Sequence, residues 1–219
     1  MPRYKLLVFD WDGTVADSLH HIIGAMEAAI ASVQLPGRSR EQILDIIGLG
    51  MQEAASCLFP DIDGALRQQM VESYSRHYLA AASGKTALFP KVEETLKQLR
   101  DSGYMLAVAT GKSRRGLERA FADTGIKGFF QTSRCADETF SKPHPQMLLE
   151  IMQTLDMTPA QTVMIGDSQH DLQMAANARV PSIAVSYGAQ PLARLLEFSP
   201  VAGVDSLDEL PIWLNTQFE

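Results

Sequence analysis

The chain has few cysteines and no long apolar run, and each of these absences excludes a class of protein. Only Cys57 and Cys135 occur, far apart and without the spacing of a metal site, so we expect free thiols in a reducing cytosol. No stretch reaches the roughly 18 uninterrupted apolar residues of a membrane-spanning helix. Residues 1–5 lack the length and the cleavage site of a signal peptide. We therefore expect a cytoplasmic protein with no membrane partner.

Positive charge is also scarce. The sequence has 19 Lys and Arg against 26 Asp and Glu, a net charge of −7. So acidic a chain is a poor binder of nucleic acids, and no nucleic-acid partner is expected. One basic run, Lys112-Ser113-Arg114-Arg115, opens a predicted helix. We interpret it as a solvated helix face, and a local role near a phosphate group stays open as the alternative. The sequence does not indicate an oligomeric state.

The first half of the chain changes from a strand to helices alone. Between residue 17 and about residue 82, apolar residues recur at helical spacing and predict four helices, near residues 19–33, 40–47, 51–58 and 66–78. Ser18 or Asp17 is the expected N-cap of the first helix. An α/β core rarely places about 65 strandless residues after its first strand. We therefore expect a four-helix insert over residues 17–83, with residues 82–85 as the return linker.

From Phe89 onward the pattern alternates between strands and helices. Strands are expected near residues 104–109, 129–132, 162–165 and 182–185, with helices between them and a closing helix at 207–214. Such alternation predicts a parallel sheet with right-handed crossovers. The predicted fold class is α/β, a Rossmann-like core over residues 1–16 and 84–219 with an inserted all-α domain.

The most informative segment follows the first strand. The apolar run Leu6-Leu7-Val8-Phe9 ends abruptly at Asp10-Trp11-Asp12-Gly13-Thr14. Two carboxylates this close repel one another unless a positive charge offsets them. A hard divalent cation with oxygen ligands is the economical solution.

Three later segments place polar residues at comparable positions. Thr110-Gly111-Lys112 follows one apolar run, and Gly166-Asp167-Ser168-Gln169-His170-Asp171 follows another. A rigid loop, Ser141-Lys142-Pro143-His144-Pro145, lies between them. Ligands of open α/β sheets bind outside the carboxyl ends of the strands, so we expect these segments to meet at one edge.

Together and in this order, the four segments resemble the motifs of the haloacid dehalogenase-like phosphohydrolase superfamily. The resemblance extends from about residue 5 to residue 188. It implies that Asp10 is the nucleophile and that Asp12 is the general acid and then the general base. Thr110 and Gly111 would bind the phosphoryl group, and Lys142 would neutralise its charge.

The resemblance also implies a metal. The expected ion is Mg²⁺, held by Asp10, Asp167 and the backbone carbonyl of Asp12, with Asp171 as an outer group that orients the cluster. His144 and His170 lie beside the motifs, but Mg²⁺ prefers oxygen over imidazole, so both are interpreted as loop residues.

The implied function is a Mg²⁺-dependent phosphatase that hydrolyses small-molecule phosphate monoesters through an aspartyl-phosphate. Its substrate would be phosphoglycolate-like, a sugar phosphate or a nucleotide. Asp12 distinguishes it from dehalogenase-like and phosphonate-cleaving members, which lack this second acid. Two alternatives stay open. One is a phosphomutase of the β-phosphoglucomutase type, which Thr14 mildly disfavours. The other is a catalytically silent binding protein on the same fold.

The insert is expected to act as a mobile cap domain that supplies specificity contacts. Its segment Ile46-Ile47-Gly48-Leu49-Gly50-Met51 resembles the cap segment of phosphoglycolate phosphatase-like members. The candidate cations for substrate contact in the insert are Arg38, Arg40, Arg67 and Arg76.

Overall fold

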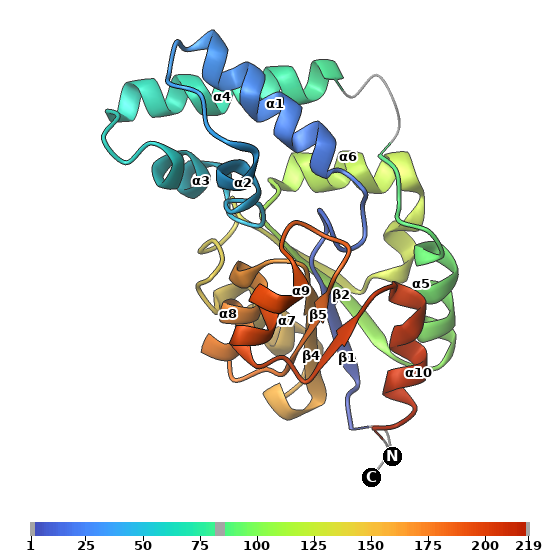
Figure 1. Ribbon diagram of the computed structural model, residues 1–219. Coiled ribbons are helices and arrows are strands. Elements are labelled where there is room, and N and C mark those ends of the chain that lie inside the picture. Colours follow the sequence, from blue (N-terminus) through green and yellow to red (C-terminus); the bar gives the residue numbers. More distant parts are fainter. Residues whose placement is uncertain (1–2, 82–85, 218–219) are drawn as a thin grey trace.

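The computed structural model describes residues 3–81 and 86–217 (Figure 1). Within them, six strands form one sheet in the order β3-β2-β1-β4-β5-β6, and every neighbouring pair is parallel. This arrangement confirms the predicted Rossmann-like α/β class. The strands are β1 (Leu6–Phe9), β2 (Met105–Thr110), β3 (Thr132–Cys135), β4 (Thr162–Gly166), β5 (Ser182–Val185) and β6 (Ala202–Val204).

Both faces of the sheet are covered by helices, which is why its central strands are continuously apolar. Leu7 and Phe9 of β1 pack on one face with α5 (Val92–Asp101), α6 (Arg114–Thr124) and α10 (Leu210–Leu214). Leu6 and Val8 pack on the other face with α7 (Gln146–Leu155) and α8 (Gln169–Asn177). The shorter α9 (Leu192–Leu195) packs against α8 and β5. Four short 3-10 helices lie in the described connections: η1 (Ile126–Phe129), η2 (Pro159–Gln161), η3 (Leu196–Phe198) and η4 (Leu207–Glu209).

The expected helices of the insert lie between β1 and α5, above the carboxyl edge of the sheet (Figure 1). They are α1 (Leu19–Ser32), α2 (Arg40–Leu44), α3 (Met51–Leu58) and α4 (Gly64–Ala81). They share an apolar core of their own, to which Met26 of α1 and Met70 of α4 contribute. The expected linker, residues 82–85, and the proposed boundary at 83/84 lie outside the described residues, and the division into two domains stays a prediction.

The sequence misplaced one strand and missed another. Residues 129–132 were expected to form a strand, but Phe129 ends η1 and the strand β3 begins only at Thr132. The apolar signal was misleading, because Phe130 lies outside the strand, partly buried against the core, with its ring packed against Trp11 and Phe121. At the edge of the sheet β3 needs few apolar residues. The other edge strand, β6, is three residues long and carries no such signal.

The closing helix expected at 207–214 is divided. Residues 207–209 form η4, and α10 begins at Leu210. Pro211 stands at the start of α10, where its missing N–H costs no helical hydrogen bond.

Candidate active site

Strand register brings the predicted residues to one edge of the sheet. Phe9 pairs with Val108 of β2 on one side and with Ile165 of β4 on the other. Asp10 follows Phe9 directly, while Thr110 and Asp167 lie two residues beyond its partners. The polar ends of three parallel strands are therefore neighbours, as the sequence predicted.

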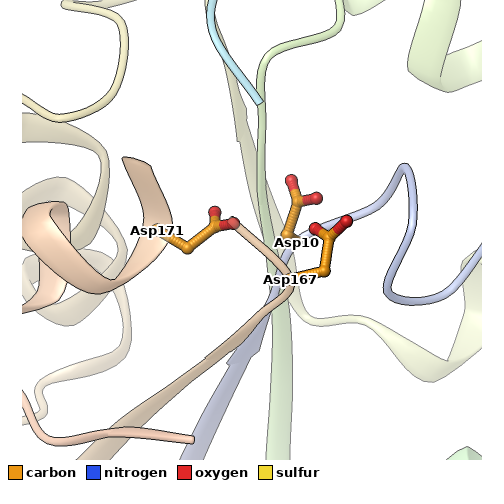
Figure 2. A group of neighbouring side chains, drawn as sticks. All are labelled: Asp10, Asp167 and Asp171. Carbon is orange, nitrogen blue, oxygen red and sulfur yellow. The ribbon is translucent and has the colours of Figure 1, made fainter. Parts of the chain in front are cut away.

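Three buried carboxylates converge at this edge. Asp10 comes from the end of β1, Asp167 from the end of β4 and Asp171 from the first turn of α8 (Figure 2). One carboxylate oxygen of each lies within 4.8 Å of the others. All three side chains are at most 1% exposed.

A buried lysine partly balances this charge. Lys142, on the loop between β3 and α7, donates to Oδ1 of Asp10 at 2.5 Å and to Oδ1 of Asp171 at 2.6 Å. Burial lowers the pKa of Lys142, but the two carboxylates outweigh that effect, so its pKa lies above the ordinary value and it stays charged. The loop thus brings Lys142 to the cluster, as predicted.

Asp171 uses its second oxygen to start α8. Oδ2 accepts hydrogen bonds from the backbone N–H and the hydroxyl of Ser168, at 3.1 and 2.7 Å. Together with the contact from Lys142, both oxygens of Asp171 are engaged. A carboxylate held in this way is suited to orienting its neighbours.

Asp167 is held by the loops around it. Its Oδ2 accepts the N–H of Ala189 at 2.7 Å, and its Oδ1 accepts the Thr14 hydroxyl at 3.3 Å. Two glycines leave room for this side chain. A Cβ at Gly13, whose φ is +85°, would lie 2.0 Å from Oδ2, and a Cβ at Gly188 would lie 2.1 Å from the Asp167 Cβ.

The electrostatics of the cluster favour a cation. Burial, opposed by Lys142 and reinforced by the other two acids, holds the pKa of Asp10 well above its ordinary value. Burial and the nearby Asp171 carboxylate raise the pKa of Asp167 to about 7. In the described part of the chain, the buried Oδ2 of Asp10 has no hydrogen-bond partner. An unpartnered carboxylate oxygen in an all-oxygen cluster fits a hard divalent ion.

Asp12 turns away from this cluster toward the insert. Its Oδ1 accepts a hydrogen bond from the Ser18 hydroxyl at 2.5 Å and forms an ion pair with Lys112 Nζ at 2.9 Å. Ser18 is the N-cap residue of α1, as expected, but its hydroxyl makes no capping bond to the helix. The expected metal contact through the Asp12 carbonyl stays a prediction.

Lys112 corrects an interpretation made from the sequence. Its side chain is only 10% exposed, so this residue is not part of a solvated helix face. Besides Asp12, it donates to the Tyr78 hydroxyl at 3.1 Å, and it lies 4.9 Å from the centre of that ring. Burial lowers the pKa of Lys112, but the nearby Asp12 carboxylate raises it by more. The pKa of Lys112 therefore lies above its usual value.

Sequence reasoning missed this contact because Tyr78 comes from α4. The only available signal was the position of Lys112, two residues beyond the end of β2 at Thr110. Thr110 itself is buried, and its hydroxyl accepts the N–H of Lys112 at 3.2 Å.

The segment of the insert between α2 and α3 rests on the core loops. A Cβ at Gly111 would lie 2.4 Å from the carbonyl oxygen of Leu49 and 2.6 Å from that of Gly48. The N–H of Gly50 donates to Ser141 Oγ at 2.7 Å. The His170 ring bonds the Asp45 carbonyl at 2.8 Å, so it faces the insert and not the acidic cluster.

A cavity of about 550 Å³ separates the insert from the sheet edge, with Asp10 and Asp12 in its wall. None of the four candidate arginines of the insert lines it. Arg38 and Arg67 are used within the insert, where they donate to the carbonyls of Leu58 and Ile62. The cavity's arginines come from α6 instead, Arg115 and Arg119.

Comparison with known proteins agrees with this geometry. The family model described as haloacid dehalogenase-like hydrolase matches residues 7–185. The chain belongs to this family. The match spans all four motifs, and it confirms both the predicted superfamily and the expectation of a hydrolytic enzyme.

Relatives of this hydrolase carry phosphatase names. It is 32% identical over 212 residues to "Probable phosphatase IndB" of Dickeya dadantii (strain 3937), covering 94% of this chain and 91% of that one. It is 29% identical over 214 residues to a phosphoglycolate phosphatase of Vibrio vulnificus (strain CMCP6), covering 94% of each. The crystal structure of a predicted phosphoglycolate phosphatase from Haemophilus somnus 129pt superposes with a TM-score of 0.82 at 26% identity, covering 96% of this chain and 97% of that chain.

Within residues 3–81 and 86–217 of this hydrolase, every helix is too short or too polar to span a bilayer.

Proposed function

We propose that this hydrolase is a Mg²⁺-dependent phosphatase that hydrolyses small phosphate monoesters through an aspartyl-phosphate on Asp10. The observation that carries the proposal is the state of the Asp10 carboxylate. Lys142 fixes one of its oxygens, and the other is buried and has no partner among the described residues. Relatives named as phosphatases support the same class of reaction.

The carboxylates fit a divalent metal. Asp10 and Asp167 would hold Mg²⁺ with the Asp12 carbonyl, while Asp171, which accepts from Lys142 through Oδ1 and from Ser168 through Oδ2, would orient Lys142 and the cluster. Bound Mg²⁺ would neutralise charge on the phosphoryl oxygens and on the acids.

In the first step, an oxygen of Asp10 attacks phosphorus and the bond from phosphorus to the ester oxygen breaks. Asp12, as the general acid, donates a proton to the departing alkoxide, so the alcohol leaves neutral. Thr110, the Gly111 N–H and Lys142 would stabilise the charge spread over the three phosphoryl oxygens.

In the second step, Asp12 accepts a proton from a water molecule as the water oxygen attacks phosphorus. The bond from phosphorus to Asp10 breaks, which releases inorganic phosphate and restores the carboxylate. Two observations support this role of Asp12: Ser18 and Lys112 hold its Oδ1, and the residue lines the cavity.

Phosphate release from a panel of monoesters tests the proposal. Treatment with EDTA should abolish turnover, and added Mg²⁺ should restore it. Without the ion, three clustered carboxylates repel one another and Lys142 alone offsets their charge. Asp10→Asn should lower kcat by about 10³-fold or more, since it keeps the shape and removes the nucleophile.

Asp101→Asn, at the exposed end of α5, is the matched control and should keep full activity. Full turnover in metal-free buffer, or by folded Asp10→Asn, would contradict the proposal. Interconversion of sugar phosphates without net phosphate release would favour the phosphomutase alternative.

A further inference from the structure

The cavity above Asp10 and Asp12 is too large for a two-carbon ester. Its volume is about 550 Å³. At about 30 Å³ per water molecule, that volume equals roughly eighteen waters, and it lies within the range of about 300–1,000 Å³ typical of sites for drug-sized ligands. A phosphoglycolate-sized substrate would leave most of this space to water.

The wall formed by the insert is predominantly apolar. The segment before α3 contributes Ile47 and Leu49, the start of α3 contributes Met51, and α4 contributes Val71 and Leu79. Exposing such an apolar surface to water is unfavourable, and a ligand with an apolar face would displace that water. The substrate body should therefore present a flat or apolar surface to the insert.

The charges around the cavity do not favour a second anionic group. Lys112 is already matched by Asp12 at 2.9 Å. The cavity wall also contains two arginines, Arg115 and Arg119. Besides Asp10 and Asp12, it contains four acids: Asp17, Glu53, Asp123 and Asp137. A second carboxylate or phosphate on the substrate would face at least as much negative as positive charge, so a neutral body is favoured.

Arg115 offers hydrogen bonds to such a body. It lies in the first turn of α6, it lines the cavity, and its guanidinium has no hydrogen bond or ion pair within the described ranges 3–81 and 86–217. A guanidinium presents several N–H donors in one plane, which suits carbonyl oxygens and ring nitrogens.

We propose that the preferred substrate is the phosphate monoester of a neutral, ring-bearing alcohol of about nucleoside size. The phosphoryl group lies at Asp10, the ring packs on the wall around Leu49 and Met51, and Arg115 donates to the polar edge of the ring. This inference rests on the proposed phosphatase function and adds the class of its substrate.

Steady-state kinetics with three kinds of probe test it. Adenosine and uridine 5′-monophosphates represent the ring-bearing class. Glycerol 3-phosphate is the ester of a small, uncharged alcohol, and 2-phosphoglycolate is small and carries a carboxylate as a second anionic group. We expect kcat/KM for at least one nucleoside monophosphate to exceed that for both small esters by about tenfold or more. Equal or higher values for either small ester would overturn this inference alone. Hydrolysis of none of them would overturn the proposed function as well.

Two variants locate the ring. Met51→Trp would fill the space beside the apolar wall. We expect it to lower kcat/KM for the nucleoside monophosphate about tenfold, mainly by raising KM, and to change kcat/KM for glycerol 3-phosphate much less. Leu149→Trp is the control for the added indole, because Leu149 lies exposed on α7 and does not line the cavity.

Arg115→Met changes an exposed position, so folding is not at risk. It should raise KM for the nucleoside monophosphate about five- to tenfold and leave kcat within about twofold. Equal losses on large and small esters in either variant, or no loss at all, would contradict the placement of the ring.

Discussion

At the scale of single residues, the site depends on how charge is matched. Lys142 contacts two of the three clustered carboxylates, and Lys112 contacts Asp12 outside that cluster. The two lysines therefore separate the acids into two groups. One is suited to binding a cation and attacking phosphorus, and the other is suited to transferring a proton at the cavity.

This division predicts the effect of removing Lys112. Lys112→Met should lower kcat about ten- to hundredfold with little change in KM, because Asp12 would lose the cation that fixes its Oδ1 while the phosphoryl-binding groups stay in place. Kinetics under saturating Mg²⁺ would measure it.

Lys127→Met, which removes an exposed lysine paired with Glu118, serves as the control and should behave as the parent protein. A Lys112→Met enzyme with unaltered kcat would show that this lysine does not position Asp12.

The motif residues could be placed from the sequence because strand register fixes them. Asp10, Thr110 and Asp167 end neighbouring parallel strands, and such ends must meet. Lys112 could not be placed, because its burial depends on Tyr78, 34 residues away in the insert. Contacts between the insert and the core depend on tertiary packing, which leaves no periodic signal.

At the scale of elements, the close approach of the insert to Gly111 gives a sharp test. Gly111→Ala keeps the backbone N–H but places a Cβ 2.4 Å from the Leu49 carbonyl oxygen, so the segment between α2 and α3 must shift. We expect kcat/KM to fall about tenfold or more while the protein remains folded.

Gly24→Ala in α1 is the matched control, because nothing lies within 4 Å of its added Cβ. It should retain activity and gain about 0.5–1 kcal/mol in the free energy of unfolding, measured by urea denaturation. Parent-like kinetics in Gly111→Ala would indicate that this contact is not needed during turnover.

Most elements followed from the periodicity, and the failures share a cause. The helices of the insert were predicted because each buries an apolar stripe in their common core. The strands β3 and β6 lie at the edges of the sheet, where burial is incomplete and the apolar pattern weak. Phe129 and Phe130 gave a stronger apolar signal than β3 itself.

At the scale of the whole molecule, the insert and the core should divide specificity from chemistry. Replacing residues 17–83 by a short linker should leave a core that binds Mg²⁺, detectable by calorimetry, but discriminates poorly among esters. The reason is that all the motif residues lie outside this range, whereas the apolar wall of the cavity lies inside it.

Removal also takes away the cover of Lys112 and Asp12, so solubility must be established first. The comparison is the spread of kcat/KM over the panel of esters for the full-length and truncated proteins. The same ranking with the same ratios in both would show that the insert does not determine specificity.

The stereochemical course at phosphorus tests most directly whether the phosphoryl group passes through Asp10. A phosphorothioate monoester made chiral with heavy oxygen isotopes would be hydrolysed in isotopically labelled water, and the configuration of the released thiophosphate determined. Attack by Asp10 followed by attack by water inverts phosphorus twice, so we predict net retention. Net inversion would mean that water attacks the ester directly, and it would contradict the account.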